Sequence, residues 1–496
     1  MKTSRLRIVR SLVKWITLLF GVLLVFVIAL VYFGWSSFAL KLPALRPWHT
    51  QAPASEFQAS DEKADYQFDD YLKQEDRVFS ELAAFVNGPW AGEAGGEFSR
   101  FGVKSVANPA TLFEQNWNRS FVREVEKPKA GVLFLHGLSD SPYSFRALSA
   151  KFHSEGYTTI GLRVPGHGTC PAALAEVTAD DWRAAVRVAA KGLRSKLPPD
   201  APMIIVGFSN GGALAADYAL SAIDDRELPR PKALILISPM IGITGLAEVT
   251  RFHKLVSAVS GDPKADWSGV DAEIDPFKYA SWPMNASVQG WKMTQRVEKG
   301  LASLAKANRM NEFPPVLTYQ SAVDATVVVS KLMNSLYNRV AKNGSELVLF
   351  DINRSNWLHS LLDLQFEKAF LPAFENKNLA YKLSQVTNTS PNSPEVHHVA
   401  RDGAKLLDDP LDLKWPRDNF SLSHFALPFP EDDPVYGALG DTSHPKLPLG
   451  HLNLRGESGV LKISDSLLLR LRHNPFYPLL ELHSIKWLDQ QLAAKK

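Results

Sequence analysis

The sequence predicts an α/β fold with a mostly parallel sheet that helices cover on both faces. From about residue 120 onward, short apolar runs rich in β-branched residues alternate with segments of helical periodicity. Continuous apolar strands separated by helices are typical of a parallel sheet buried on both faces. The second observation is the pentapeptide Gly207-Phe208-Ser209-Asn210-Gly211, which stands between a buried strand and a helix. We therefore expect an α/β domain with large insertions, although the length of 496 residues also allows two domains.

Each predicted element has its own local signal. The candidate strands are the apolar runs at residues 121–125, 131–135, 158–164, 203–206, 233–237, 316–319 and 347–350. Helical periodicity predicts helices over 144–155, 180–197 and from 210 onward, with a closing amphipathic helix over 479–492. Asp180 is the expected N-cap of the second helix, because an aspartate can accept hydrogen bonds from the free amides of the first turn.

The chain divides into five segments by composition. Residues 240–313 interrupt the rhythm of strands and contain Trp267, Trp282 and Trp291, which predicts a helical cap or lid. Residues 36–75 are polar, acidic and proline-containing, which indicates a linker. The predicted segments are an N-terminal anchor at 1–36, a linker and N-terminal extension at 37–118, the first half of the core at 119–239, the cap at 240–313, and the second half of the core with a C-terminal insertion at 314–496.

An uncharged apolar segment, Trp15–Phe33, stands near the N-terminus. Its length in a helix is about 28 Å, enough to cross the hydrocarbon core of a bilayer. Because the N-terminal cations precede it, we expect a single-pass inner (plasma) membrane protein with a cytoplasmic N-terminus and a periplasmic, extracytoplasmic body. The alternative is a cleaved signal peptide with Ser37-Phe38-Ala39 as its cleavage site, although the apolar run is longer than a typical signal core.

Charge and cysteine content exclude several classes of function. Removing five N-terminal cations from the net charge of +3 leaves −2 for the rest; these are Lys2, Arg5, Arg7, Arg10 and Lys14. A nearly neutral body argues against nucleic acid as a partner. Cys170 is the single cysteine, so no intrachain disulfide and no cysteine pair for zinc exist. No phosphate-binding loop or dinucleotide fingerprint occurs, and we expect no cofactor and no metal.

The pentapeptide around Ser209 predicts a nucleophile elbow. A turn this sharp between strand and helix requires residues with almost no side chain two positions before and after the serine. Its strain lifts the hydroxyl of Ser209 off the end of the sheet, and the following helix points its first amides at an oxyanion formed on an attacked carbonyl. Ser209 is therefore the candidate nucleophile.

Four sequence pieces, in this order and spacing, resemble the α/β-hydrolase superfamily. They are Leu135-His136-Gly137-Leu138, Arg163-Val164-Pro165-Gly166-His167-Gly168-Thr169, Asp181-Trp182, and Gly207-Phe208-Ser209-Asn210-Gly211-Gly212. The resemblance covers roughly residues 120–352 and is greatest to the monoglyceride lipase, lysophospholipase and carboxylesterase branch of serine hydrolases. It implies a cap insertion and an oxyanion hole formed by the backbone amides of Leu138 and Asn210. It also implies that His136 is structural and braces that loop.

A serine nucleophile needs a base and a carboxylate that orients the base, and in this fold their chain order is Ser, Asp or Glu, then His. Asp324 follows the strand at 316–319 and stands at the position that the family uses for its acid; Asp351, at the end of the next strand, is the alternative. Among the histidines after Asp324, His424 lies between small and proline-rich turn elements and resembles a stretch in membrane-anchored bacterial relatives. His359 is the alternative base.

The expected function is hydrolysis of a carboxylic ester, with a small-molecule or lipid ester as substrate. A triad of Ser209, His424 and Asp324 would form an acyl-enzyme and need no cofactor. Two alternatives remain at this level: a non-catalytic scaffold or binding protein with the same fold, and an acyltransferase that uses the same triad. The sequence does not specify acyl chain length, head group or oligomeric state.

Overall fold

The computed structural model describes residues 13–22, 34–35, 37–93, 96–242, 257, 261–324, 326–355, 367–368, 370–417, 419–438, 447, 449–451 and 471–493. Its strands are β1 (Phe121–Arg123), β2 (Ala130–Leu135), β3 (Tyr157–Leu162), β4 (Met203–Phe208), β5 (Ala233–Ile237), β6 (Trp267–Gly269), β7 (Trp282–Pro283), β8 (Val316–Ser321), β9 (Glu346–Phe350), β10 (Lys382–Asn388), β11 (Glu395–Asp402) and β12 (Lys405–Lys414). Its α-helices are α2 (Pro47–Thr50), α3 (Phe68–Asn87), α4 (Pro109–Leu112), α5 (Arg146–Ser154), α6 (Pro171–Glu176), α7 (Ala179–Ser195), α8 (Asn210–Asp224), α10 (Met284–Lys306), α11 (Val329–Leu332), α12 (Leu371–Glu375) and α13 (Tyr477–Ala493).

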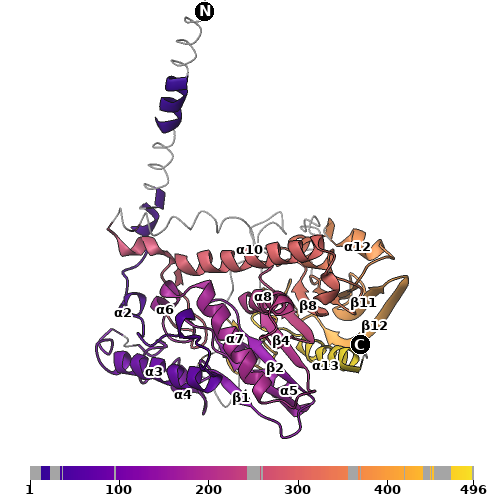
Figure 1. Ribbon diagram of the computed structural model, residues 1–496, viewed down its shortest axis with the longest axis horizontal. Helices are drawn as coiled ribbons and strands as arrows, with labels where there is room; N and C mark the ends of the chain where they lie inside the picture. Colours follow the sequence, from indigo (N-terminus) through magenta and orange to yellow (C-terminus); the bar gives the residue numbers. More distant parts are fainter. Residues whose placement is uncertain are drawn as a thin grey trace, which may run out of the picture.

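Within the described residues, ten strands form one large sheet in the order β1-β3-β2-β4-β5-β8-β9-β10-β11-β12 (Figure 1). Neighbouring strands from β3 through β10 pair in parallel. The edge strands β1, β11 and β12 pair antiparallel. The predicted mostly parallel sheet is therefore confirmed, with β4 in its central part.

Side chains of the central strands alternate between two buried clusters, one on each face of the sheet. In β4, Ile204 and Val206 face the cluster that α5 and α13 cover, whereas Met203 and Ile205 face the cluster that α7 and α8 cover. Strands with both faces buried are the reason for the continuous apolar runs in the sequence. The predicted covering of both faces by helices is confirmed.

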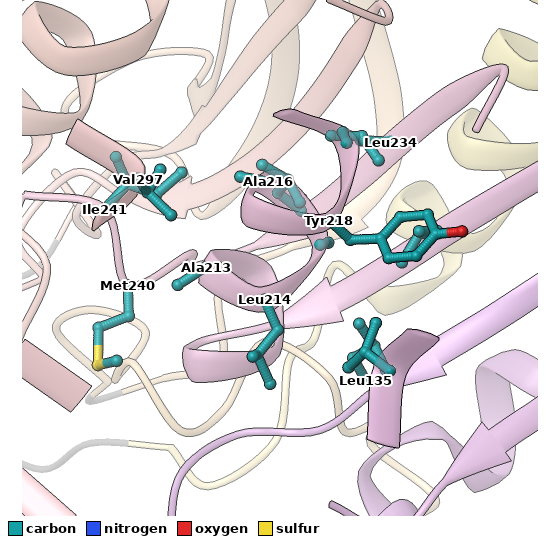
Figure 2. Close-up of a cluster of buried hydrophobic side chains, with 14 of the residues drawn as sticks. Leu135, Ala213, Leu214, Ala216, Tyr218, Leu234, Met240, Ile241 and Val297 are labelled. Atoms are coloured by element: carbon teal, nitrogen blue, oxygen red, sulfur yellow. The ribbon is translucent and has the colours of Figure 1, made fainter. Parts of the chain in front are cut away.

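Helix α10 adds a further layer on the side of the sheet that α8 covers. Figure 2 shows Val297 of α10 beside Ile241, while Leu214 of α8 points toward Leu135 of β2. All of these side chains belong to one hydrophobic cluster. The described part of the predicted cap segment thus contains β6, β7 and α10; residues 243–256 and 258–260 of that segment lie outside the described residues.

The prediction of a linker at residues 36–75 is wrong for most of that segment. Phe57, Phe68 and Tyr71 are buried in the main hydrophobic cluster, and α3 packs against α7. One of the acidic residues that indicated a linker, Glu56, instead pairs with a buried cation, and so does Glu75 at the end of the segment. Arg163, 1% exposed, binds Glu56 through Nη2 (2.9 Å) and Glu75 through Nε (3.0 Å). The N-terminal extension is therefore part of the domain.

Three strands near the C-terminus, β10 to β12, were not predicted from the sequence. The β12 side chains are largely exposed and include a proline and several charged residues, as expected for an edge strand, so no apolar run marks it. The predicted closing helix is confirmed as α13. The predicted N-cap of α7 is wrong by two residues: Thr178 is the cap, and its hydroxyl and the carboxylate of Asp181 form a capping box.

No helix among the described residues is long and apolar enough to span a bilayer. The predicted span Trp15–Phe33 is described only as far as residue 22, and residues 23–33 lie outside the described residues. Residues 13–22 are helical and project away from the body (Figure 1), with Trp15, Leu19 and Phe20 among their exposed side chains.

Replacing Arg163 tests whether the N-terminal extension is integral to the fold. In Arg163→Met, two carboxylates would stay in a buried site without their cation, and we expect the free energy of unfolding to fall by about 3–5 kcal/mol. Chemical denaturation of the full chain measures this change. The control is Lys73→Met in an exposed pair with Asp70, which should change stability by less than about 0.5 kcal/mol. A loss below about 1 kcal/mol for Arg163→Met would contradict the interpretation.

Candidate active site

Ser209 lies at the sharp turn between β4 and α8, in a backbone conformation that L-residues rarely adopt. Its φ is 52° and its ψ is −115°. Such strain persists only when the surroundings enforce it. The amide of Ser209 donates to the carbonyl of Ile237 (2.9 Å), and its carbonyl accepts from the amide of Met240 (2.8 Å). Ser209 is 8% exposed, so the strand-end contacts hold the serine in a closely packed turn that leaves little of it accessible.

The two glycines of the pentapeptide are required because other backbone atoms approach each of them closely. A Cβ atom on Gly211 would lie 1.7 Å from the carbonyl oxygen of Leu135, and a Cβ on Gly207 would lie 2.3 Å from the carbonyl oxygen of Gly211. Both distances are far below van der Waals contact. The helix therefore crosses the strand end at a distance that only glycine permits, which is the geometry expected of a nucleophile elbow.

Asp324 lies beyond the end of β8, and its carboxylate is fully engaged. Oδ1 accepts from the amides of Thr326 (2.8 Å) and Val327 (3.0 Å). Oδ2 accepts from Nε2 of Gln320 (2.7 Å) and is 2.7 Å from Nδ1 of His424. The side chain is inaccessible to solvent. These bonds fix the carboxylate in one orientation, aimed at the imidazole.

His424 stands between the acid and the elbow. Besides the bond to Asp324, its ring packs against Phe208, the residue before Ser209, with centroids 5.4 Å apart. Its Nε2 makes no hydrogen bond to the part of the chain that the structure describes. With Nδ1–H donating to the carboxylate, Nε2 carries a lone pair, the tautomer that a general base needs. The structure thus brings the predicted acid and the predicted base together beside the elbow.

The loop that carries His424 is attached to the strand ends. Ser321 Oγ donates to the carbonyl of Leu422 (3.0 Å), which ties the loop to the end of β8. The amide of Asn353, just after β9, donates to the carbonyl of Phe420 (2.7 Å), and its Nδ2 donates to the carbonyl of Asn419 (2.8 Å). The base loop therefore lies beside the end of β9, although its residues come much later in the chain.

The predicted oxyanion donors lie on either side of Ser209. Gly137 is so near the elbow that a Cβ there would be 3.3 Å from the Cβ of Ser209, and Leu138 follows it directly. Asn210 is the first residue of α8. Among the described residues, neither the amide of Leu138 nor that of Asn210 donates to a backbone carbonyl. Both amides are thus left available at the ends of β2 and β4.

His136 is structural, as the resemblance implied. The amide of Val164 donates to its Nε2 (3.0 Å), so Nδ1 carries the proton and donates to the carbonyl of Gly137 (2.9 Å). Burial, and after it the charge of nearby His167, keeps the pKa of His136 well below its usual value. The neutral ring braces the loop that presents Leu138.

The structure describes the alternative acid, Asp351, but not the alternative base, His359. Asp351 is buried and bound to Arg354 (Nε to Oδ2, 2.5 Å) and to the hydroxyl of Thr387 (2.6 Å). These partners give it a structural role in the end of the sheet. His359 lies outside the described residues.

Gln320 is a residue of the site that sequence reasoning missed. Its Nε2 bridges Oδ2 of Asp324 and the carbonyl of Val327 (3.1 Å), and so holds the carboxylate beneath the histidine. No motif marks this position. The signal available in the sequence was a glutamine inside an apolar, fully buried strand, where an amide must find partners.

A buried polar cluster joins the cap segment to the oxyanion loop. The amide of Tyr279 donates to the carbonyl of Ser139 (2.8 Å). Asp140 accepts from the hydroxyl of Ser144, and Lys278 is its main source of attractive charge. Burial raises the pKa of Asp140 to about 6. The loop with Leu138 is therefore held from the cap side by a backbone hydrogen bond, beside a buried carboxylate that the charge of Lys278 attracts.

No group of three or more His, Cys, Asp or Glu within the described residues is arranged to hold a metal ion. The reactive groups gathered here are a serine, an imidazole and a carboxylate. This set supports nucleophilic catalysis with a general base.

A protein-family model, described as serine aminopeptidase, S33, matches residues 126–351. That range contains β2 through β9 and includes Ser209 and Asp324, while β1 precedes it and His424 lies beyond it. The strand order, the helices on both faces and the elbow agree with this match. The chain has an α/β-hydrolase fold.

Among the proteins that this chain is similar to are lipolytic enzymes. A thermostable monoacylglycerol lipase of Bacillus sp. (strain H-257) is 30% identical over 128 residues, which are 26% of this chain and 50% of that protein. The chain thus spans about half the length of this curated relative. Among solved structures, a metagenome-derived lipolytic enzyme is 24% identical (TM-score 0.37, covering 47% of this chain and 87% of that one). A monoglyceride lipase of Saccharomyces cerevisiae is 15% identical (TM-score 0.38, 47% and 82%).

The raised pKa of Asp140 predicts a defined pH dependence of stability. Since its pKa is about 6 in the folded chain and about 3.9 when unfolded, the folded state binds this proton more tightly. The contribution of Asp140 to the free energy of unfolding should therefore fall as pH rises from about 4 to about 6, by on the order of 2 kcal/mol.

Asp140→Asn removes this dependence and tests it. The stability of the variant relative to the parent should increase by on the order of 2 kcal/mol between pH 4 and pH 7, measured by chemical denaturation. Asp200→Asn, at an exposed aspartate, is the control and should show no such trend. A constant difference between Asp140→Asn and the parent over this pH range would exclude the assignment.

Proposed function

We propose that this protein is a serine hydrolase that cleaves carboxylic esters through Ser209, His424 and Asp324. The observation that carries the proposal is the 2.7 Å contact between His424 Nδ1 and Asp324 Oδ2 beside the strained elbow of Ser209. The lipolytic relatives support esters, among them lipid esters, as the substrate class.

The reaction would follow from this arrangement in two halves. Nε2 of His424 takes the proton of Ser209 Oγ as that oxygen attacks the ester carbonyl carbon, and the amides of Leu138 and Asn210 stabilise the oxyanion by about 3–4 kcal/mol each. His424 then protonates the leaving alkoxide, and an acyl-enzyme remains. A water molecule that His424 deprotonates attacks the acyl carbon, and the acid leaves as Ser209 regains its proton.

Labelling of the full chain with a fluorophosphonate probe tests the triad. Ser209→Ala should abolish labelling, and His424→Ala and Asp324→Asn should each slow it by about 10³–10⁴-fold. His397→Ala, in an ion pair with Asp408 on β12, is the control and should label at the parent rate. If His359→Ala is silent while His424→Ala labels normally, the assignment of the base is wrong.

The same protein preparations distinguish ester hydrolysis from the alternative functions. Release of acid from an ester series supports hydrolysis, transfer of the acyl group to an added alcohol in preference to water supports an acyltransferase, and turnover of an aminoacyl arylamide alone supports a peptidase. A folded parent chain that never labels would overturn the proposal in favour of a non-catalytic scaffold.

We also propose that the chain is anchored in the inner (plasma) membrane by its N-terminal segment, with the body on the extracytoplasmic side. The apolar composition of Trp15–Phe33 and the exposed apolar side chains of the helix at 13–22 support this. In membranes from cells that produce the full chain, the protein should resist extraction by alkaline carbonate, and external protease should reach the body only after the outer layers of the cell are opened. Complete release by carbonate would contradict the anchor.

A further inference from the structure

Helix α10 has two sharply different faces. Its inner face, with Met293, Val297 and Leu301, is buried against the rest of the domain. Its outer face carries a line of exposed cations, which we term the basic stripe: Lys292, Arg296, Lys299 and Lys306. Spacings of four, three and seven residues place side chains along one side of an α-helix, so these charges lie in a row that is nearly opposite the buried face.

The lysines of the basic stripe are not neutralised by neighbours. Among the described residues, Lys292, Lys299 and Lys306 make no ion pair, while Arg296, 50% exposed, binds Asp217. Lys292, Arg296 and Lys299 of the stripe line one side of a groove of about 620 Å³ between α10 and α8. Trp291, Asp217 and Asp224 also line this groove. Both of these carboxylates are already paired, Asp217 with Arg183 and Asp224 with Arg309. The outer face of α10 is therefore net positive on a body that is close to neutral.

Helix α10, which carries the basic stripe, runs along the side of the body from which the N-terminal segment departs (Figure 1). Nε1 of Trp35 donates to the carbonyl of Ala265 (3.0 Å), and Nζ of Lys264 donates to the carbonyl of Leu42 (3.0 Å). Residues 264–265 lead directly into β6, which pairs with β7, and α10 begins at the end of β7. In Figure 1 the N-terminal helix accordingly rises from the side of the molecule along which α10 runs.

We propose that the basic stripe is a docking surface for the headgroups of an anionic lipid bilayer, on which the body lies along α10. The proposal rests on the proposed membrane anchor, since a tether that starts beside α10 keeps this face within reach of the bilayer. Lysines near an anionic surface are attracted over about one Debye length, 8–10 Å at physiological salt. Trp291, in the adjoining groove, is of the type that favours membrane interfaces. Docking would fix the orientation of the candidate active site relative to the membrane.

Energy transfer between the stripe and lipid headgroups tests this docking. A donor dye is attached at Ser303→Cys, an exposed position on the same line as the stripe. Cys170 does not compete, because it is buried and burial raises the pKa of its thiol to about 12. The full chain is reconstituted in phosphatidylcholine vesicles with and without about 30% phosphatidylglycerol, each containing a headgroup-labelled acceptor.

We expect energy transfer to be higher with the anionic lipid at about 0.1 M salt and to fall at about 1 M salt. Lys292→Glu/Lys299→Glu/Lys306→Glu should lower the ratio of docked to undocked molecules by at least about 100-fold. The matched control, Lys127→Glu/Lys191→Glu/Lys405→Glu, makes the same change of charge at exposed lysines outside α10 and should retain the parent signal.

Two results would overturn the docking surface: equal energy transfer in the two kinds of vesicle, or equal loss in the stripe and control triples. Failure of the anchor is recognised separately, because the chain would then be extracted by alkaline carbonate. In that case energy transfer with the same vesicles still reports on the stripe, since electrostatic binding of the body alone would remain sensitive to salt and to the stripe triple.

Discussion

The crossing of α8 over the end of β2 is the constraint on which the candidate site depends. The backbone of Gly211 approaches the carbonyl of Leu135 so closely that no side chain fits between them. This contact forces the turn at Ser209 into its strained conformation, which packing on both faces of the sheet sustains. The same closeness brings the amides that follow β2 and β4 to the two sides of one serine. The positions of the candidate nucleophile and of the candidate oxyanion donors therefore follow from a single packing distance.

Near this crossing, buried charged side chains orient segments of the chain that hydrophobic contacts alone would not orient. Arg163 joins the N-terminal extension to the end of β3. Lys278 of the cap segment attracts the buried Asp140 in the loop that follows Leu138. Removing one partner from such a cluster is costly, whereas the intact cluster contributes little net stability. The ion pairs of Arg163 therefore specify where the N-terminal extension lies on the core.

The sequence predicted most accurately what is encoded locally. The strand–turn–helix at Ser209 and the parallel strands each follow from a few consecutive residues. The acidic segment near Glu56 and Glu75 was misread as a linker, because its buried partner Arg163 lies far along the chain. Gln320 and the edge strand β12 were missed because an isolated buried amide and an exposed strand leave no periodic signal. Long-range pairing decides the burial of Glu56 and Glu75, and one sequence does not display it.

The fold explains how His424 reaches Asp324 although the two residues lie far apart in the sequence. Asn353 binds the carbonyl of Asn419, 66 residues later, so the chain leaves the end of β9 and returns to it. Between these points it adds β10, β11 and β12 to the sheet. The entropic cost of closing a loop rises only slowly with the length of the loop. The chain can therefore leave the end of β9, form three further strands and return, so that the loop with His424 lies beside β9. The strands of the excursion also pair with β9 and one another, which provides the rigidity that a base at 2.7 Å from its carboxylate requires.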